Sequence, residues 1–473
     1  MRIRLSRLGP RLGAYDIEPS CGVLDILEGS RVAKRIVTDC GLIPRTVKAF
    51  SKDLPYHAPD FSFFDDGVPI DAVRLTHAHT DHIGLVPRLA RYMAPHARVW
   101  MTRPTYACSL PVFEEGLRLS GMRATEPPFD YGEMIDVVSR ASVIDKPGEV
   151  EILPGITDLV WPRGHINGAC SFTTRLGRAH IHYAGDGCEH DQPGVKGALL
   201  HPAEWRPHVI AGSDSTYGAD RNSDARSWKD EMDKGYDACA NAVKAGHPAI
   251  WFTFALHRAG ALAHEMARRG LPDLAPVFLD GSAKSFARIM MSSEGRWCKE
   301  DTPLLLNGIT MVNSRERDEI AGLKGYTVIT PPGMGGPGGL ASHWRRIALP
   351  DPNAVVIFTG FVAPGTDGDL ILRKAEERDF EEKEVSAEFG IEDSVTGEVM
   401  VETIPIRARV IQIRTGSHDS RGKVLDWYGR MRPEVAVLSH GSRKALSSLE
   451  GDLSSAVRHV FRADRVRTIE LDI

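Results

Sequence analysis

Cysteine is scarce in this sequence. Seven cysteines occur among 473 residues, an odd number, and no two of them form a Cys-x-x-Cys pair. Disulfide frameworks use dense, paired cysteines, and structural zinc sites use closely spaced ones. We therefore expect neither a disulfide scaffold nor a cysteine-bound zinc, and a reducing cytoplasm is the favoured location.

Long hydrophobic runs are also missing. The N-terminal residues Met1 to Leu5 alternate arginine with apolar residues and lack the apolar core of a signal peptide. The apolar run from Ala354 to Phe358 is far too short to cross a bilayer and is typical of a buried strand. The sequence therefore predicts no membrane partner.

Neither basic nor acidic residues are in large excess. The 58 basic and 63 acidic residues leave a formal net charge of -5, which argues against binding nucleic acid by bulk charge alone. A local basic channel is still compatible with this balance. A chain of this length with 42% hydrophobic residues is long enough to bury two sizeable cores.

One stretch, from Leu75 to Gly84, is rich in metal-binding side chains. It places three histidines and one aspartate within six residues, in the order His-x-His-x-Asp-His. A short β-type run precedes it, and an apolar-periodic run over residues 84–92 predicts a helix after it. The cluster is thus expected on a loop between a strand and a helix.

The residue types in this loop suit zinc and similar divalent ions. His77 and His79 lie two residues apart, so both can bind one ion from an extended turn. Asp81 and His82 are adjacent and can point to a second ion. We therefore expect a site for two metals.

Six more histidines and aspartates each follow a run of apolar or β-branched residues. Any one of them alone is weak evidence, because an acid or a histidine beside glycine is common in turns. Their order along the chain is what makes them informative. They are Asp39 in Asp-Cys-Gly, His165 in Gly-His, Asp186 in Gly-Asp-Gly, Asp214 in Gly-Ser-Asp, His418 in Gly-Ser-His and His440 in Ser-His-Gly.

The first half of this series resembles the metallo-β-lactamase fold. Asp39, the loop at residues 77–82, His165 and Asp186 are similar to its motifs 1, 2, 3 and 4. The resemblance implies an α/β fold, an αββα sandwich, with a two-metal hydrolytic site at one edge of the sheets. The ions are expected to be two Zn²⁺, with Mn²⁺ or Mg²⁺ as alternatives.

The second half resembles the β-CASP family, the branch of this fold that cleaves nucleic acids. Asp214, His418 and His440 are similar to its motifs A, B and C. The long segment between the first two then corresponds to an inserted α/β domain, in which strands alternate with helices. The expected organisation is a metallo-β-lactamase domain over 1–216, a β-CASP domain over 217–405, and the return of the first domain over 406–473.

The resemblance also assigns roles to single residues. Asp39 would support the metal ligands from behind, and His418 would protonate the leaving oxygen while Asp214 orients it. The resemblance also implies a catalytic role for Asp81, beside His418 and Asp214. The implied substrate contacts are Arg258, Ser417 and Gly441. The implied ligands are His77, His79 and His165 for one ion, Asp81, His82 and His440 for the other, and Asp186 shared by both.

The substrate implied is single-stranded RNA, because RNA-processing members of the family carry histidine at motif C, here His440. Three alternatives stay open: a DNA nuclease of the same family, another two-metal hydrolase such as a thioesterase-like or lactonase-like enzyme, and a non-catalytic scaffold. The mode of cleavage, internal or from the 5′ end, is not decided by the sequence, and a homodimer is the candidate assembly.

Overall fold

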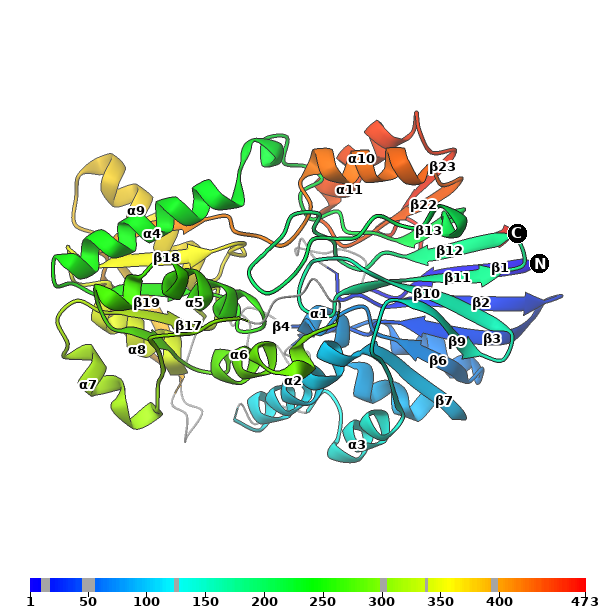
Figure 1. Cartoon of the computed structure of the whole chain (residues 1–473), viewed down its shortest axis with the longest axis horizontal. Helices are drawn as coiled ribbons and strands as arrows, with labels where there is room; N and C mark the ends of the chain where they lie inside the picture. Colours follow the sequence, from blue (N-terminus) through cyan, green and yellow to red (C-terminus); the bar gives the residue numbers. More distant parts are fainter. Residues whose placement is uncertain (10–17, 45–55, 123–126, 298–303, 337–338, 393–398) are drawn as a thin grey trace.

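The computed structural model describes residues 1–9, 18–44, 56–122, 127–297, 304–336, 339–392 and 399–473 (Figure 1). Two seven-stranded sheets and one six-stranded sheet form its framework. Six cysteines are buried and free, as expected, while Cys298 lies outside the described residues. No helix among the described residues is long and apolar enough to cross a membrane.

The first seven-stranded sheet contains the strand that leads into the histidine-rich loop. Its neighbouring strands β3 and β6 run parallel, so both deliver their carboxyl ends to one edge. In order, its strands are β24 (Thr468–Asp472), β1 (Arg2–Arg7), β2 (Gly22–Glu28), β3 (Arg31–Thr38), β6 (Ile70–Arg74), β7 (Met93–Thr102) and β8 (Ala141–Ile144).

The second seven-stranded sheet contains the strands that precede the later site residues. Strands β12, β13 and β22 run parallel to one another, so the loops after them also meet at one edge. In order, its strands are β23 (His459–Arg462), β22 (Val435–Leu438), β13 (Val209–Gly212), β12 (Ala179–Tyr183), β11 (Cys170–Leu176), β10 (Ile156–Pro162) and β9 (Gly148–Leu153).

The two sheets pack face to face. Because side chains alternate along a strand, Leu24 and Ile36 face a core shared with Ile181 and Val209 of the second sheet. Their neighbours in the chain, such as Val37, face the other way. Helices cover both outer faces: α2 (Arg103–Met122) and α3 (Tyr131–Ser139) over the first sheet, α10 (Arg421–Met431) and α11 (Arg443–Leu453) over the second. The expected αββα sandwich is confirmed.

The six-stranded sheet is wholly parallel and lies on the left of Figure 1. Both faces are covered by helices, which explains why its strands are almost continuously apolar. In order, its strands are β16 (Ile309–Met311), β15 (Val277–Leu279), β17 (Thr327–Thr330), β14 (Ala249–Phe252), β18 (Val355–Thr359) and β21 (Arg409–Ile413). Its helices are α4 (Trp228–Lys244), α5 (Arg258–Arg268), α6 (Ala283–Met291), α7 (Arg317–Ala321), α8 (Gly339–Ala348) and α9 (Asp367–Glu381).

Two sequence predictions differ from the structure. The expected domain return at residue 406 precedes β21, which pairs with β18 along five residues, so hydrogen bonding keeps the chain in the six-stranded sheet up to Ile413. The helix expected over 84–92 is instead α1 (Thr80–Ile83) followed by a 3-10 helix over Val86–Tyr92. Pro87 lies at the start of the latter and has no N–H to continue the turn of α1.

Two short pairs complete the described strands. Strands β4 (Ile43–Pro44) and β5 (Tyr56–His57) pair with each other beside the sandwich. Strands β19 (Ser386–Glu392) and β20 (Val399–Pro405) form an antiparallel pair that packs on α9 and α8. The chain ends meet, since the N-terminal amine donates to the carbonyl of Ile473 at 3.0 Å, at the outer end of the sandwich (Figure 1).

Candidate metal centre

The predicted ligands come together where the loops after β3, β6, β10, β12 and β22 meet. Tight packing of the backbone holds these loops in place. A Cβ added to Gly41 would lie 1.7 Å from the carbonyl oxygen of Asp81, so only glycine lets the two loops approach this closely. Asp39 and His440 adopt positive φ values of 59° and 49°, a backbone conformation that non-glycine residues rarely adopt outside functional sites.

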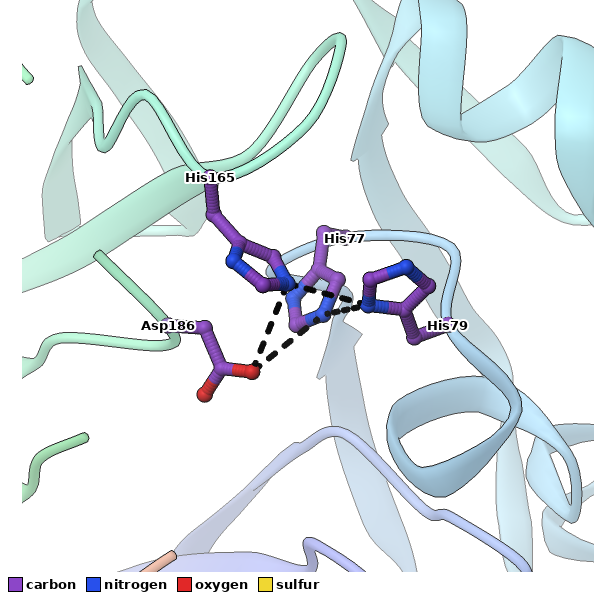
Figure 2. A group of neighbouring side chains, drawn as sticks. All are labelled: His77, His79, His165 and Asp186. Atoms are coloured by element: carbon purple, nitrogen blue, oxygen red, sulfur yellow. Dashed lines mark hydrogen bonds and ion pairs between the residues drawn. The ribbon is translucent and has the colours of Figure 1, made fainter. Parts of the chain in front are cut away.

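One group of side chains consists of His77, His79, His165 and Asp186 (Figure 2). The Nε2 atoms of His77 and His165 lie 3.1 and 3.0 Å from the Nδ1 atom of His79. All four ligand atoms lie within 4.8 Å of one another. Three imidazole nitrogens and a carboxylate oxygen thus face one point.

A second group consists of Asp81, His82 and His440, on the other side of Asp186. The Oδ2 atom of Asp186 lies 3.5 Å from His82 Nε2 and 3.2 Å from His440 Nε2. The same oxygen lies 3.7 and 3.6 Å from the Nε2 atoms of His77 and His165. Asp186 is therefore central to both groups.

Hydrogen bonds at the Nδ1 atoms, on the side away from the centre, fix the orientation of the His82 and His165 rings. The carboxylate of Asp39 accepts from Nδ1 of His82 at 2.9 Å and from the backbone and hydroxyl of Thr76 at 2.8 and 2.7 Å. The Nδ1 atom of His165 donates to the carbonyl of Ser417 at 2.6 Å. Each bond leaves the Nε2 atom of its ring turned to the centre, as metal-binding histidines require.

Burial and neighbouring charges set the protonation of the side chains in the centre. Burial, together with neighbouring imidazoles, lowers the pKa of His77 and His165 well below the usual value, so both rings are neutral. Burial raises the pKa of Asp186, but the charges of His440 and His82 outweigh it and keep the carboxylate ionised. Burial lowers the pKa of His82, but the charges of Asp186 and Asp39 outweigh it and raise that pKa well above the usual value. The ring therefore carries a proton on Nε2, which a bound cation would displace.

The residues present fit divalent cations. Two nitrogens about 2.0–2.1 Å from one tetrahedral ion lie about 3.3 Å apart, close to the spacings around His79. Among the described residues, His82 Nε2 and Asp186 Oδ1 are buried without a hydrogen-bond partner. Unpartnered buried polar atoms are costly, and a bound cation would satisfy them.

Beside this centre, His418 and Asp214 form a pair. The Nδ1 atom of His418 lies 2.7 Å from Oδ2 of Asp214, and the backbone of Thr216 donates to the other carboxylate oxygen at 3.0 Å. Burial lowers the pKa of His418, but Asp214 raises it more, to about 9. Asp186 and His440 are also near enough for this pair to join them around an ion, so a metal role competes with an acid role here.

The predicted substrate contacts differ in their surroundings. Arg258 is buried at the start of α5, donates from Nη2 to Ser417 Oγ at 2.9 Å, and leaves Nη1 without a partner among the described residues. Gly441 is buried too, and a Cβ there would lie 2.7 Å from the carbonyl oxygen of Ser215. Gly441 therefore lets two loops pack closely, and a substrate contact for it stays a prediction.

Sequence reasoning missed three residues that support the centre. Thr76 ties the histidine loop to Asp39, and no short motif marks it. Asn167 donates to the carbonyls of Gly194 and Gly295, and its side-chain oxygen lies 3.1 Å from Nδ1 of His257. His257 has a φ of 63° and is buried, so these contacts join the loop of His165 to the six-stranded unit.

Comparison with protein families gives two matches. Residues 33–187 match the metallo-beta-lactamase superfamily, and residues 403–461 match the Zn-dependent metallo-hydrolase RNA specificity domain. A solved structure of a protein of unknown function from Enterococcus faecalis V583 shares the fold, with a TM-score of 0.54 over 100% of both chains at 13% identity.

Three curated relatives illustrate the range of similarity. Ribonuclease TTHA0252 of Thermus thermophilus is 25% identical, over 94% of this chain and 95% of its own length. Transcription termination factor FttA of Thermococcus kodakarensis is 26% identical over 90% of this chain. The match covers 65% of the length of that protein. Endoribonuclease YSH1 of Mycosarcoma maydis is 23% identical over 82% of this chain and 43% of its own length.

Proposed function

The chain belongs to the β-CASP branch of the metallo-β-lactamase superfamily, and we propose that it is a metal-dependent ribonuclease that hydrolyses phosphodiester bonds of single-stranded RNA. The observation that carries the proposal is the position of Asp186. One carboxylate oxygen lies between two groups of histidines, at 3.2–3.7 Å from four of their nitrogens. This is the arrangement expected for two ions that share one ligand.

The proposed ligands are those that the sequence predicts. His77, His79 and His165 would hold one ion, Asp81, His82 and His440 the other, and Asp186 both. Zn²⁺ is the first choice, because imidazole and carboxylate suit it, with Mn²⁺ or Mg²⁺ as alternatives. When bound, two such ions supply a nucleophilic water and neutralise the phosphate charge.

The chain's own side chains would handle the leaving group. The carboxylate of Asp214 holds Nδ1 of His418 and favours the protonated ring, so Nε2 can deliver a proton to the departing oxygen. The buried guanidinium of Arg258 has a free Nη1 among the described residues and supports a role in holding a phosphate of the substrate.

Two lines support RNA over DNA. His440 stands at the position where RNA-processing members carry histidine, and the match over 403–461 is to an RNA specificity domain. We further propose a location in the cytoplasm, in line with the free buried cysteines, and a homodimer as the working assembly.

A second candidate function is a part in ending transcription. Several relatives with that printed name match over 90–99% of this chain, although the chain spans only 65–71% of their length. Cleavage of the nascent RNA would serve both functions, so this candidate concerns the natural substrate and not the chemistry.

The test is digestion of end-labelled single-stranded RNA, with DNA of the same sequence beside it. We expect RNA to be cut faster, with 5′-phosphate on the downstream fragment, and Asp186→Asn to abolish cleavage. RNA carrying a 5′-phosphate or a 5′-hydroxyl distinguishes cleavage from the end from internal cleavage. Products with a 2′,3′-cyclic phosphate, or equal cleavage of DNA, would contradict the proposal.

A further inference from the structure

Two exposed phenylalanines follow neighbouring strands at the carboxyl edge of the six-stranded sheet. Strands β14 and β18 are parallel neighbours that end at Phe252 and Thr359. Phe254 and Phe361 each follow two residues later and are 38% and 40% exposed. Phe252 pairs with Phe358, so the same register continued by two residues brings Phe254 opposite Gly360, the residue before Phe361.

Glycines surround the ring of Phe254. A Cβ added to Gly333 would lie 3.4 Å from its Cδ2 atom, and one added to Gly360 would lie 4.0 Å from its Cε2 atom. The ring therefore reaches the backbone just before Phe361. Because these neighbours carry no side chain, the aromatic surface stays accessible.

This edge is connected directly to the proposed proton donor. The next strand, β21, runs parallel to β18 and leads within five residues to His418. The backbone of Gly360 donates to the carbonyl of Ile413 at 2.7 Å, and the side chain of Gln412 donates to the carbonyl of Gly360, also at 2.7 Å. The phenylalanine loop and the His418 loop are thus held together at their bases.

The loop that carries Phe254 is hydrogen-bonded to the turn that carries Arg258, the proposed phosphate contact. The backbone of Ala259 donates to the carbonyl of Phe254 at 3.1 Å, closing the turn that carries Arg258. Arg258 in turn donates to Ser417, the residue before His418. The two rings and the unpartnered guanidinium nitrogen of Arg258 therefore belong to one structural unit.

We infer that Phe254 and Phe361 form a stacking platform for bases of the RNA strand that flank the scissile phosphate. This inference rests on the proposed function. Aromatic side chains bind single-stranded nucleic acid because every base offers a π-face, whatever the sequence. With a net charge of -5, the chain has little bulk attraction for RNA, so stacking supplies affinity that charge does not.

The experiment measures RNA binding by fluorescence anisotropy, with a labelled single-stranded oligoribonucleotide and all variants in a His418→Ala background that leaves the RNA uncut. Phe254→Leu and Phe361→Leu should each weaken binding by about 5- to 150-fold, while Phe254→Trp and Phe361→Trp should retain it. Phe380→Leu is the matched control, because Phe380 is also exposed but lies near the far end of α9. The helix places it about 20 Å from Asp367, the first residue of α9.

A set of oligoribonucleotides that each lack one base locates the contact. Removal of the stacked base should weaken binding to the parent protein but have little further effect on Phe361→Leu, since two changes to one contact are not additive. Each leucine variant should bind as much metal as the parent protein, which shows that the centre is intact.

The outcomes separate this inference from the function on which it rests. If RNA binds but the leucine variants behave like Phe380→Leu, or if base removal costs the same in Phe361→Leu as in the parent, the platform is wrong and the proposed function stands. If no RNA binds to the parent protein, both are overturned.

Discussion

The most informative perturbation separates the proton donor from the metal ligands. The structure leaves both roles open to His418, which lies 2.7 Å from Asp214 and 4.0 Å from Asp186. If His418 is the acid, His418→Ala should keep its metal and lose about 10²–10⁴-fold in kcat, or about 3–5 kcal/mol of transition-state stabilisation. His79→Ala should lose metal together with activity, because the Nε2 atoms of two other proposed ligands, His77 and His165, lie 3.1 and 3.0 Å from its Nδ1.

The hydrogen bond to Asp214 allows a second variant to test the same role. Asp214→Asn keeps the shape of the side chain but removes the negative charge that raises the pKa of His418. It should therefore resemble His418→Ala in rate and in metal content. His180→Ala is the control, since this histidine lies on β12, away from the centre, and contacts the carbonyl of Arg206.

The assay combines metal analysis of the purified variants with single-turnover cleavage of RNA. A substrate with a p-nitrophenyl leaving group adds a sharper readout, because p-nitrophenolate leaves without a proton. On that substrate His418→Ala should regain most of the lost rate, whereas His79→Ala should not. Loss of metal from His418→Ala, or an equal defect on both substrates, would refute the acid role and favour a ligand role.

Three further predictions concern packing and charge. Asp158→Ala should lower the free energy of unfolding by about 3–5 kcal/mol in urea titrations, because it leaves the fully buried Arg74 without its partner at 2.8 Å between the two sheets. Burial raises the pKa of Glu18 from 4.5 to about 7, so between these values the folded state retains a proton that the unfolded state loses. The free energy of unfolding should therefore fall by up to about 3 kcal/mol as the pH rises from about 5 to 7. Glu18→Gln should abolish that fall. Gly41→Ala should shift the loop of Asp81 and lower metal content, and unchanged metal would contradict the packing argument.

The resemblance of the ordered motifs to the metallo-β-lactamase fold predicted the sandwich, and local sequence order supports it. Two of the strands that lead to site residues, β3 and β22, end in apolar or β-branched runs followed by a turn, whereas β12 carries two histidines within it. The histidine loop carries its own information, since its four residues lie within six positions. The α/β class and the inserted unit are confirmed for the same reason: parallel strands such as β14 and β18 are short, buried and separated by helices.

Long-range contacts could not be predicted in this way. Aspartate and histidine are enriched among non-glycine residues at positive φ, but the positive φ of Asp39 and of His440 depends on the loops packed around them. The return of the chain was placed too early because β21 has the same composition as a strand of either unit; only its pairing with β18 assigns it. The hydrogen bond of Asn167 to His257 spans 90 residues, and no motif links them.

Ser417 shows why the two units must act together. Its carbonyl accepts from Nδ1 of His165, which belongs to the sandwich, and its hydroxyl accepts from Arg258, which belongs to the inserted unit. One residue therefore fixes the orientation of a proposed ligand and the position of a proposed phosphate contact, and the next residue is the proposed acid. A small shift between the units would change all three at once, because hydrogen bonds of this kind weaken steeply with distance and angle. The alignment of metal, phosphate and proton donor is thus a property of the interface between the units and of neither unit alone.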